Sequence, residues 1–159
     1  MSKTAVLGFG NTVRSDGAIG CYVIDELTAF FMTSRSVTLF DMGSSSSEIM
    51  YRLKGHDYVI LVDGTTDTNE APGTIIKLSE SETKVIPQEN SSLSLHSLNW
   101  DQALVYGRKV LQEEFPRKVE VFLIAIDNTQ IEGELSDEVK KAGDEVVKQI
   151  RRSIAEVEY

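Results

Sequence analysis

Apolar residues occur along this chain in two alternating patterns. Short continuous apolar runs, which are typical of buried strands, occupy 3–10, 36–42, 57–66 and 118–127. Between and after these runs, apolar residues recur with the period of an amphipathic helix. The first such helix follows the first run and is expected to bury Ile19, Val23, Leu27 and Phe30, with Ile24 and Phe31 beside them.

Three later segments extend the helical pattern. A short helix within 45–55 begins with serines and ends at a glycine, and a longer one spans 92–112. The last helix, at 135–157, has Ser136 as its cap. Its apolar stripe is Val139, Ala142, Val146, Ile150 and Ile154. Segments 71–80 and 83–88 are weaker strands, expected to form an extra hairpin or a sheet edge.

Strands that alternate with helices predict an α/β fold. We expect a single domain, 1–159, with a doubly wound, twisted, mostly parallel sheet and helices on both faces. In such a sheet the binding site lies outside the carboxyl ends of the strands, where the loops gather. Polar residues that follow strands are therefore the candidates for chemistry.

Three acids and a histidine lie at this edge of the predicted sheet. Asp16 follows the glycine turn after the first strand, and Asp41 and Asp63 end the second and third. His96 begins the long helix that follows a polar loop. Each alone is more often a cap or a turn former. Together they favour a divalent-ion site with nitrogen and oxygen ligands, or general-base activation of water without a metal. His56 precedes a strand and is expected to be structural.

Charge and composition narrow the range of partners. The chain has 16 basic and 25 acidic residues and a net charge of -9, which repels phosphate backbones, so nucleic acid is not an expected partner. No apolar run is long enough to span a membrane, and the start lacks the apolar core of a signal peptide. We therefore expect a cytoplasmic protein without a membrane partner. Cys21 is expected to pack in the core, because a reactive thiol needs an electropositive, partly exposed setting.

The glycine-rich loop GFGNTVRSDGAIG, 8–20, resembles a phosphate cradle at first sight. A dinucleotide fingerprint, however, requires a third glycine at the position that Val13 occupies. It also requires an acid about 20 residues further on, and Asp41 lies too far from Gly10 to be that acid. A Walker lysine is also missing. The loop is better interpreted as a tight turn that places Asp16 at the carboxyl edge.

In this order and spacing, the motifs resemble those of the hydrogenase maturation endopeptidases, which process the large subunit of nickel-iron hydrogenases. The resemblance covers nearly the whole chain and rests on VLGFGNTVRSDGAIG, LFDMG, VILVDGT, HSLNWDQAL and the more divergent IAIDNTQIEGELSDEV. It implies a phosphorylase/hydrolase-like α/β fold. It also implies an endopeptidase that removes the carboxyl-terminal extension of a nickel-loaded large-subunit precursor, after the last metal-binding cysteine motif.

The resemblance also assigns roles to residues. It makes Asp63, His96 and Asp16 the catalytic residues and the contacts to nickel, which is the substrate's own ion, so that the resting enzyme can be metal-free. The supporting pocket comprises Asp41, Gly17, Gly10 and Asn11.

One position departs from the family pattern. The family has a second acid directly after the aspartate of the first loop, whereas this chain has Gly17. Three alternatives follow: Asp16 swings in to serve, which a flexible glycine helps; Asp63 and His96 act alone; or proteolysis is lost and the protein is a metal-checking or chaperone module. A small-ligand-binding α/β protein is a more distant alternative. Asp127 replaces the usual proline of the last loop, which indicates a divergent subgroup.

Overall fold

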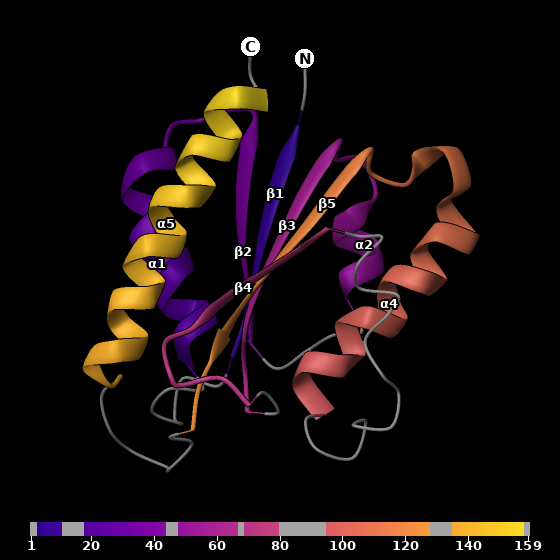
Figure 1. Ribbon diagram of the computed structural model, residues 1–159. Helices are drawn as coiled ribbons and strands as arrows, with labels where there is room; N and C mark the ends of the chain where they lie inside the picture. The colour runs from indigo at the N-terminus through magenta and orange to yellow at the C-terminus, as the bar shows by residue number, and fades with distance from the viewer. Residues whose placement is uncertain are drawn as a thin grey trace.

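The four strands predicted from continuous apolar runs all form, and they lie side by side in one sheet (Figure 1). The computed structural model describes residues 3–10, 18–43, 48–66, 69–79, 95–127 and 135–157, with the backbone alone for 95–102. Within this part, the strands are β1 (Thr4–Phe9), β2 (Val37–Gly43), β3 (Tyr58–Thr65), β4 (Ile75–Ser79) and β5 (Lys118–Ala125). The helices are α1 (Ile19–Phe31), α2 (Ile49–Leu53), α4 (Leu95–Leu111), the 3-10 turn η3 (Gln112–Glu114) and α5 (Asp137–Val157).

The sheet is mostly parallel, as predicted. Its strand order is β2-β1-β3-β5-β4, and the first four strands in this order pair in parallel. Among the described strands, only β4 is antiparallel; it pairs with β5 and forms one edge of the sheet. The weak strand expected within 71–80 is therefore a sheet edge, whereas the one expected at 83–88 lies outside the described residues.

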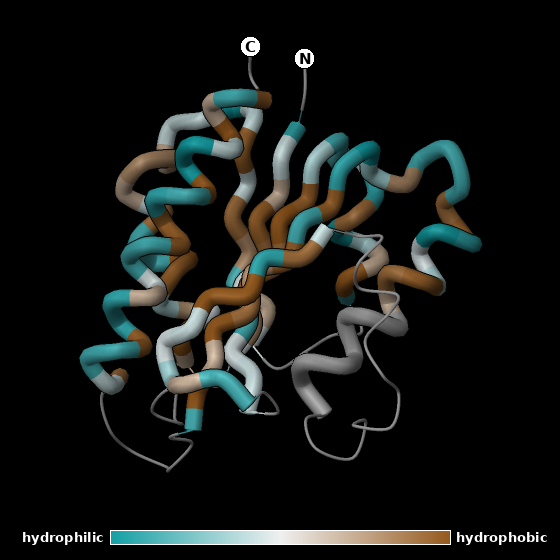
Figure 2. Tube along the Cα trace, in the orientation of Figure 1, coloured by the Kyte–Doolittle hydropathy of each residue, from teal (hydrophilic) through white to brown (hydrophobic). Residues whose placement is uncertain are grey.

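Helices cover both faces of the sheet, which makes the fold doubly wound. Figure 1 shows α1 and α5 on one side and α2 and α4 on the other. Alternate residues of each strand face opposite layers: in β3, Ile60 and Val62 pack toward α1 and α5, and Val59 and Leu61 toward α2 and α4. Figure 2 shows the strands as the most hydrophobic part of the trace, between more polar helices. Among the described residues, no helix combines the length and apolar character needed to cross a membrane.

The apolar stripe predicted for the last helix is confirmed, because all five of its members are buried in α5. The stripe predicted for α1 is confirmed at Ile19, Val23 and Leu27 but is wrong at Phe30, whose side chain is 50% exposed. The core covered by α1 ends about one turn earlier, at Leu27, and the neighbouring Phe31 makes the last partial contact with it. Helical periodicity alone does not show where the sheet beneath a helix stops.

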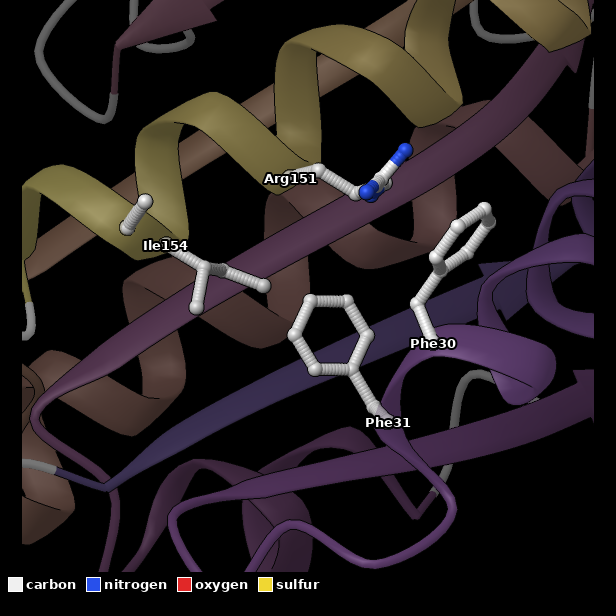
Figure 3. Close-up of a pocket in the computed structure, with 5 residues that line it drawn as sticks. Phe30, Phe31, Arg151 and Ile154 are labelled. Atoms are coloured by element: carbon white, nitrogen blue, oxygen red, sulfur yellow. The ribbon is translucent and has the colours of Figure 1, made fainter.

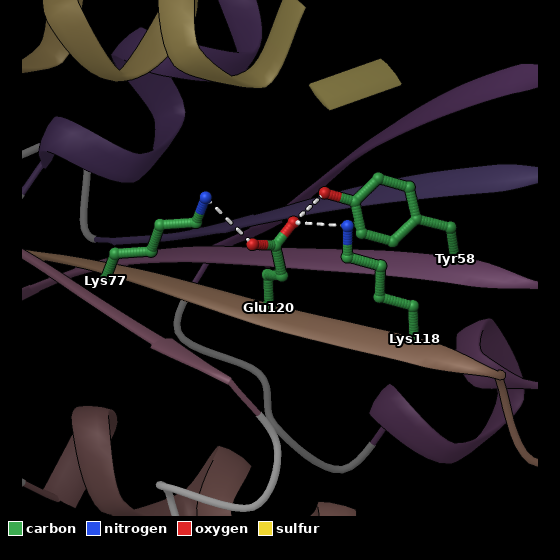
Figure 4. A network of polar contacts seen from close by, with 4 residues as sticks. All are labelled: Tyr58, Lys77, Lys118 and Glu120. Carbon is green, nitrogen blue, oxygen red and sulfur yellow. Dashed lines mark hydrogen bonds and ion pairs between the residues drawn. The ribbon is translucent and has the colours of Figure 1, made fainter. Parts of the chain in front are cut away.

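A polar network joins three strands at the end of the sheet where the parallel strands begin (Figure 4). The Tyr58 hydroxyl donates a hydrogen bond to the buried Glu120 carboxylate, and the ammonium groups of Lys77 and Lys118 lie 3.0 Å and 3.6 Å from its oxygens. Burial acts to raise the pKa of Glu120, but the hydrogen bonds from Tyr58 and Lys77 and the two positive charges outweigh it and lower that pKa. An ionised Glu120 therefore links β3, β4 and β5.

Two glycines allow β1 and the start of α1 to touch through their backbones. A Cβ atom on Gly20 would lie 1.9 Å from the carbonyl oxygen of Phe9, and one on Gly8 would lie 2.5 Å from the carbonyl oxygen of Gly20. Real Cβ atoms do not approach backbone atoms so closely. The glycines that bound the first loop are thus required by helix–strand packing, whatever else the loop does.

We expect Gly20→Ala to lower the free energy of unfolding by about 3 kcal/mol, because the clash is with backbone atoms that cannot rotate away. Urea denaturation monitored by circular dichroism measures the change. Gly107→Ala in α4 is the matched control, since its Cβ would meet only the mobile end of the Leu53 side chain, at 2.9 Å. The control should stay within about 1 kcal/mol of the parent. Equal losses in the two variants would contradict this account.

Candidate active site

The strand order creates a switch point between β1 and β3. From β1 the chain crosses through α1 to β2 on one side, and it then returns past β1 to form β3 on the other. In doubly wound sheets, ligands bind in the crevice outside the carboxyl ends of the two strands at such a point. Asp63, near the end of β3, is the first polar residue after the buried run of that strand.

Asp63 is a buried carboxyl group with one unpaired oxygen. The residue is 4% exposed, and its Oδ1 accepts a hydrogen bond of 2.8 Å from the backbone N–H of Gly64. Its Oδ2 is also buried and has no hydrogen-bond partner among the described residues. Burial raises the pKa of Asp63 well above its usual value, and the Gly64 N–H opposes this only in part. Such groups are costly for stability and are characteristic of functional sites.

The side chain of Asp63 belongs to the face of the sheet that α4 covers. Asp63 pairs in register with Leu123, which packs in the cluster between the sheet and α2 and α4. α4 begins at Leu95, at the end of the molecule where β3 finishes (Figure 1), and His96 lies in its first turn. The backbone of His96 is therefore at the carboxyl edge, on the same side of the sheet as Asp63. The His96 side chain is outside the described part, so its contact with Asp63 stays a prediction.

Asp41 lies at the same edge but on the opposite face. Gly8 of β1 pairs with Asp41 on one side and with Val62 on the other, so Asp41 shares the α1 face with Val62, whereas Asp63 follows Val62 and faces the other way. The Asp41 carboxylate accepts hydrogen bonds from the Cys21 thiol and the Gly43 N–H, both at 3.1 Å. The sheet thus separates two carboxylates that the sequence places side by side.

Cys21 has the packing role expected of it. Its side chain is 4% exposed at the start of α1, with Sγ 3.1 Å from Asp41 and 3.8 Å from the carbonyl oxygen of Gly10. Burial, followed by the hydrogen bond to Asp41 and its charge, raises the pKa of the Cys21 thiol to about 12. The thiol therefore stays protonated at neutral pH and is a poor nucleophile.

Of the remaining predicted site residues, the structure describes Gly10 but not the other three. Asn11, Asp16 and Gly17 lie outside the described residues. Gly10, directly after β1, donates its N–H to the carbonyl oxygen of Gly43 over 2.8 Å. In the ranges that the structure describes, no three His, Cys, Asp or Glu side chains gather to hold a metal ion.

His56 lies away from the carboxyl edge, whereas Gly64 lies next to Asp63. His56 lies at the amino edge, before β3, where its Nδ1 is 2.7 Å from the carbonyl oxygen of Arg52, which fits the structural role predicted for it. Gly64 was not singled out from the sequence, although it provides the hydrogen bond to Asp63. A Cβ atom on Gly64 would lie 3.0 Å from Ile19, so a larger residue would press against α1. The Asp-Gly pair directly after five apolar residues was the available signal.

These features are typical of an α/β enzyme whose site lies at the switch point of its sheet. A family model described as hydrogenase maturation protease, HycI, matches residues 21–153. The chain therefore belongs to the hydrogenase maturation protease family, and its activity is that of an endopeptidase. It is 27% identical over 117 residues to the hydrogenase 2 maturation protease of Escherichia coli strain K12, a match that covers 74% of this chain and 69% of that protein.

Solved structures share the fold. The hydrogenase maturating endopeptidase HybD from Escherichia coli superimposes with a TM-score of 0.82 at 22% identity, over 98% of this chain and 93% of that one. The [NiFe] hydrogenase maturation protease HycI from Thermococcus kodakarensis KOD1 gives a TM-score of 0.70 at 20% identity, over 94% and 90% of the two chains. At these identities the likeness establishes the α/β architecture and not the individual site residues.

We expect Asp63→Asn to raise the stability of the protein at neutral pH. Because the pKa of Asp63 is raised in the folded state, the folded protein holds a proton that the unfolded chain releases above about pH 4. The parent therefore loses stability as the pH rises from about 4 toward the folded-state pKa, and asparagine removes this loss. At pH 7 to 8 the gain should be roughly 1 kcal/mol, or about 2–4 °C in Tm, and it should shrink toward pH 4.

Thermal unfolding between pH 4 and pH 8 checks this expectation. Asp127→Asn is the matched control, since it removes an exposed carboxylate that follows β5 at the same edge of the sheet. If the stability difference between Asp63→Asn and the parent does not change with pH, the buried charge of Asp63 is not its cause.

Proposed function

We propose that this endopeptidase removes the carboxyl-terminal extension of the nickel-loaded large-subunit precursor of a [NiFe] hydrogenase. Membership of the maturation protease family supports the class of substrate. The observation that carries the proposal is the buried Asp63 carboxyl group at the switch point of the sheet, on the face covered by the helix whose first turn contains His96. Its Oδ2 has no hydrogen-bond partner among the described residues. Such a group is suited to bind a cation or to orient a water molecule.

In this proposal the nickel ion arrives as part of the substrate. Nickel accepts imidazole nitrogen and carboxylate oxygen as ligands, which Asp63 and His96 can supply. A cation that approaches Asp63 favours its ionised form and offsets the cost of burying the charge.

Peptide cleavage then requires a water molecule and a proton carrier. Asp63, or the ion that it binds, orients the water for attack on the scissile carbonyl carbon, and a carboxylate takes the proton of that water and passes it to the leaving nitrogen. Asp16 is the proposed proton carrier, since in the sequence it falls between β1 and α1, and β1 is one of the two strands at the switch point. Gly17 gives that loop the backbone freedom to bring Asp16 into place.

The same Gly17 supports a second candidate function. Without the family's acid at this position, the protein can bind the loaded precursor and fail to cut it, acting as a check on metal insertion. The two functions differ in one observable. Cleavage shortens the precursor, whereas checking leaves a stable complex of full length.

We expect the purified protein to shorten nickel-loaded precursor by the mass of its carboxyl-terminal peptide and to leave metal-free precursor intact. Asp63→Asn and His96→Ala should each slow cleavage at least about 100-fold, because each removes a group that contacts the ion or the attacking water. Mass spectrometry of timed samples measures the rates. Asp127→Asn should cleave at the parent rate, and circular dichroism verifies that every variant is folded. A stable complex without any loss of mass would favour the checking function.

Gly17→Glu distinguishes an adapted site from a lost one. If Asp16 has taken over the role of the missing acid, the added carboxylate competes with it, and we expect cleavage to slow by about tenfold or more. If the protein only checks the precursor, the same change should create cleavage where the parent shows none. Rates equal to those of the parent would show that position 17 does not take part in the site.

A further inference from the structure

Three cationic side chains form an exposed stripe on one face of α5. Arg151 and Arg152 follow Lys148 by three and four residues, and all three side chains are exposed. They line a hollow of ≈ 370 Å³ together with Ala155. The stripe is positively charged, although the formal net charge of the chain is -9.

The stability of the fold does not account for this stripe. No carboxylate in the described ranges forms an ion pair with Lys148, Arg151 or Arg152, and the nearby Asp144 instead accepts a hydrogen bond of 2.7 Å from the Tyr22 hydroxyl. The last turn of α5 contains no basic residue, so the three cations do not complement the negative end of the helix dipole. Like charges three and four residues apart weaken a helix. These positive charges are therefore available to a partner.

An apolar pocket adjoins the stripe. It has a volume of ≈ 230 Å³ and lies between the ends of α1 and α5, lined by Phe30, Phe31, Arg151, Ile154 and Ala155. Figure 3 shows the two phenylalanine rings on the α1 side, facing Arg151 and Ile154 on the α5 side. Because Arg151 and Ala155 line both hollows, pocket and stripe form one groove, apolar at one end and cationic at the other.

Arg151 joins the two halves of this groove. Its guanidinium carbon lies 3.6 Å from the centroid of the Phe30 ring, a cation–π contact that orients the planar guanidinium group. The Phe30 ring remains 50% exposed, and Met32, just after α1, is 76% exposed. Apolar surface thus remains uncovered directly beside positive charge.

We propose that this groove binds an acidic segment of a partner protein that carries an apolar side chain beside its carboxylates. Arginine pairs with carboxylates through two parallel hydrogen bonds, and an apolar side chain fits the pocket between the two helices. A small anion would leave that pocket unfilled. A bilayer favours a protruding apolar surface over a hollow that receives single side chains. A nucleic acid would meet the repulsion of a strongly acidic protein.

The groove lies at the end of the molecule opposite to Asp63. Both α1 and α5 finish at the end where β1 begins, whereas Asp63 is at the carboxyl end of β3 (Figure 1). A partner bound here therefore leaves the candidate active site open. The inference goes beyond the proposed function and stands independently of it.

The test uses the full-length protein, labelled with ¹⁵N, and a synthetic peptide with two Glu-Glu pairs on either side of Leu-Phe. We expect backbone amide shifts on titration to concentrate at Phe30, Phe31, Arg151 and Ala155, and the affinity to fall as sodium chloride is added. The double variant Lys148→Glu/Arg152→Glu should bind the peptide at least about tenfold more weakly. Arg151 is left intact because it packs on Phe30.

Lys140→Glu/Lys141→Glu is the matched control. It makes the same change of charge at exposed positions about two turns earlier in α5, and neither residue lines the groove. This variant should keep the parent affinity within about twofold, as exposed charges at a distance are screened. An equal loss of affinity in the two double variants would mean that net charge, and not the groove, governs binding.

Three other results would overturn the proposal. The first is equal binding of a peptide in which every glutamate is replaced by glutamine, which would remove the role of the cations. The second is the absence of shifts in the groove at millimolar peptide. The third is binding to phosphatidylglycerol vesicles that Lys148→Glu/Arg152→Glu abolishes, without any binding of the peptide, which would assign the groove to a lipid surface.

Discussion

The contact between the backbone of β1 and the first turn of α1 is the constraint on which the rest of the molecule depends. It exists because neither Gly8 nor Gly20 has a side chain, so that the helix starts directly against the strand. This contact brings Cys21 to Asp41 and fixes how α1 leaves the carboxyl edge. The switch point between β1 and β3 lies beside this contact, because β1 is one of its two strands and α1 is the first helix to leave it.

Two polar groups at opposite ends of the sheet illustrate how burial and pairing work together. Glu120 is buried but receives a hydrogen bond from Tyr58 and the charges of Lys77 and Lys118, so it is ionised and links three strands. Asp63 is also buried, but from the described residues it receives only the hydrogen bond of the Gly64 N–H. A satisfied buried acid stabilises the fold, whereas a half-satisfied one costs stability that a bound cation or water can return.

Two places at opposite ends of the described structure have charged or ionisable groups without an ion-pair partner. At the carboxyl edge Asp63 Oδ2 lacks a hydrogen-bond partner among the described residues, and toward the far ends of α1 and α5 three cations lack a described carboxylate partner. We propose a metal-loaded substrate for the first place and an acidic partner segment for the second. Their separation by the length of the sheet allows the protein to hold a partner at one end while its active site works at the other.

The sequence by itself determined the order of strands and helices, the parallel sheet, the family and the presence of Asp63 at the carboxyl edge, because apolar periodicity and strand ends are local properties of the chain. Only the tertiary structure decided that Asp41 and Asp63 point to opposite faces, since this depends on how β2 and β3 align with Gly8 of β1. It also decided that Phe30 stays half exposed and contacts Arg151, because other elements determine how far the core extends beneath α1. Register and the limits of packing arise between segments, and no single segment encodes them.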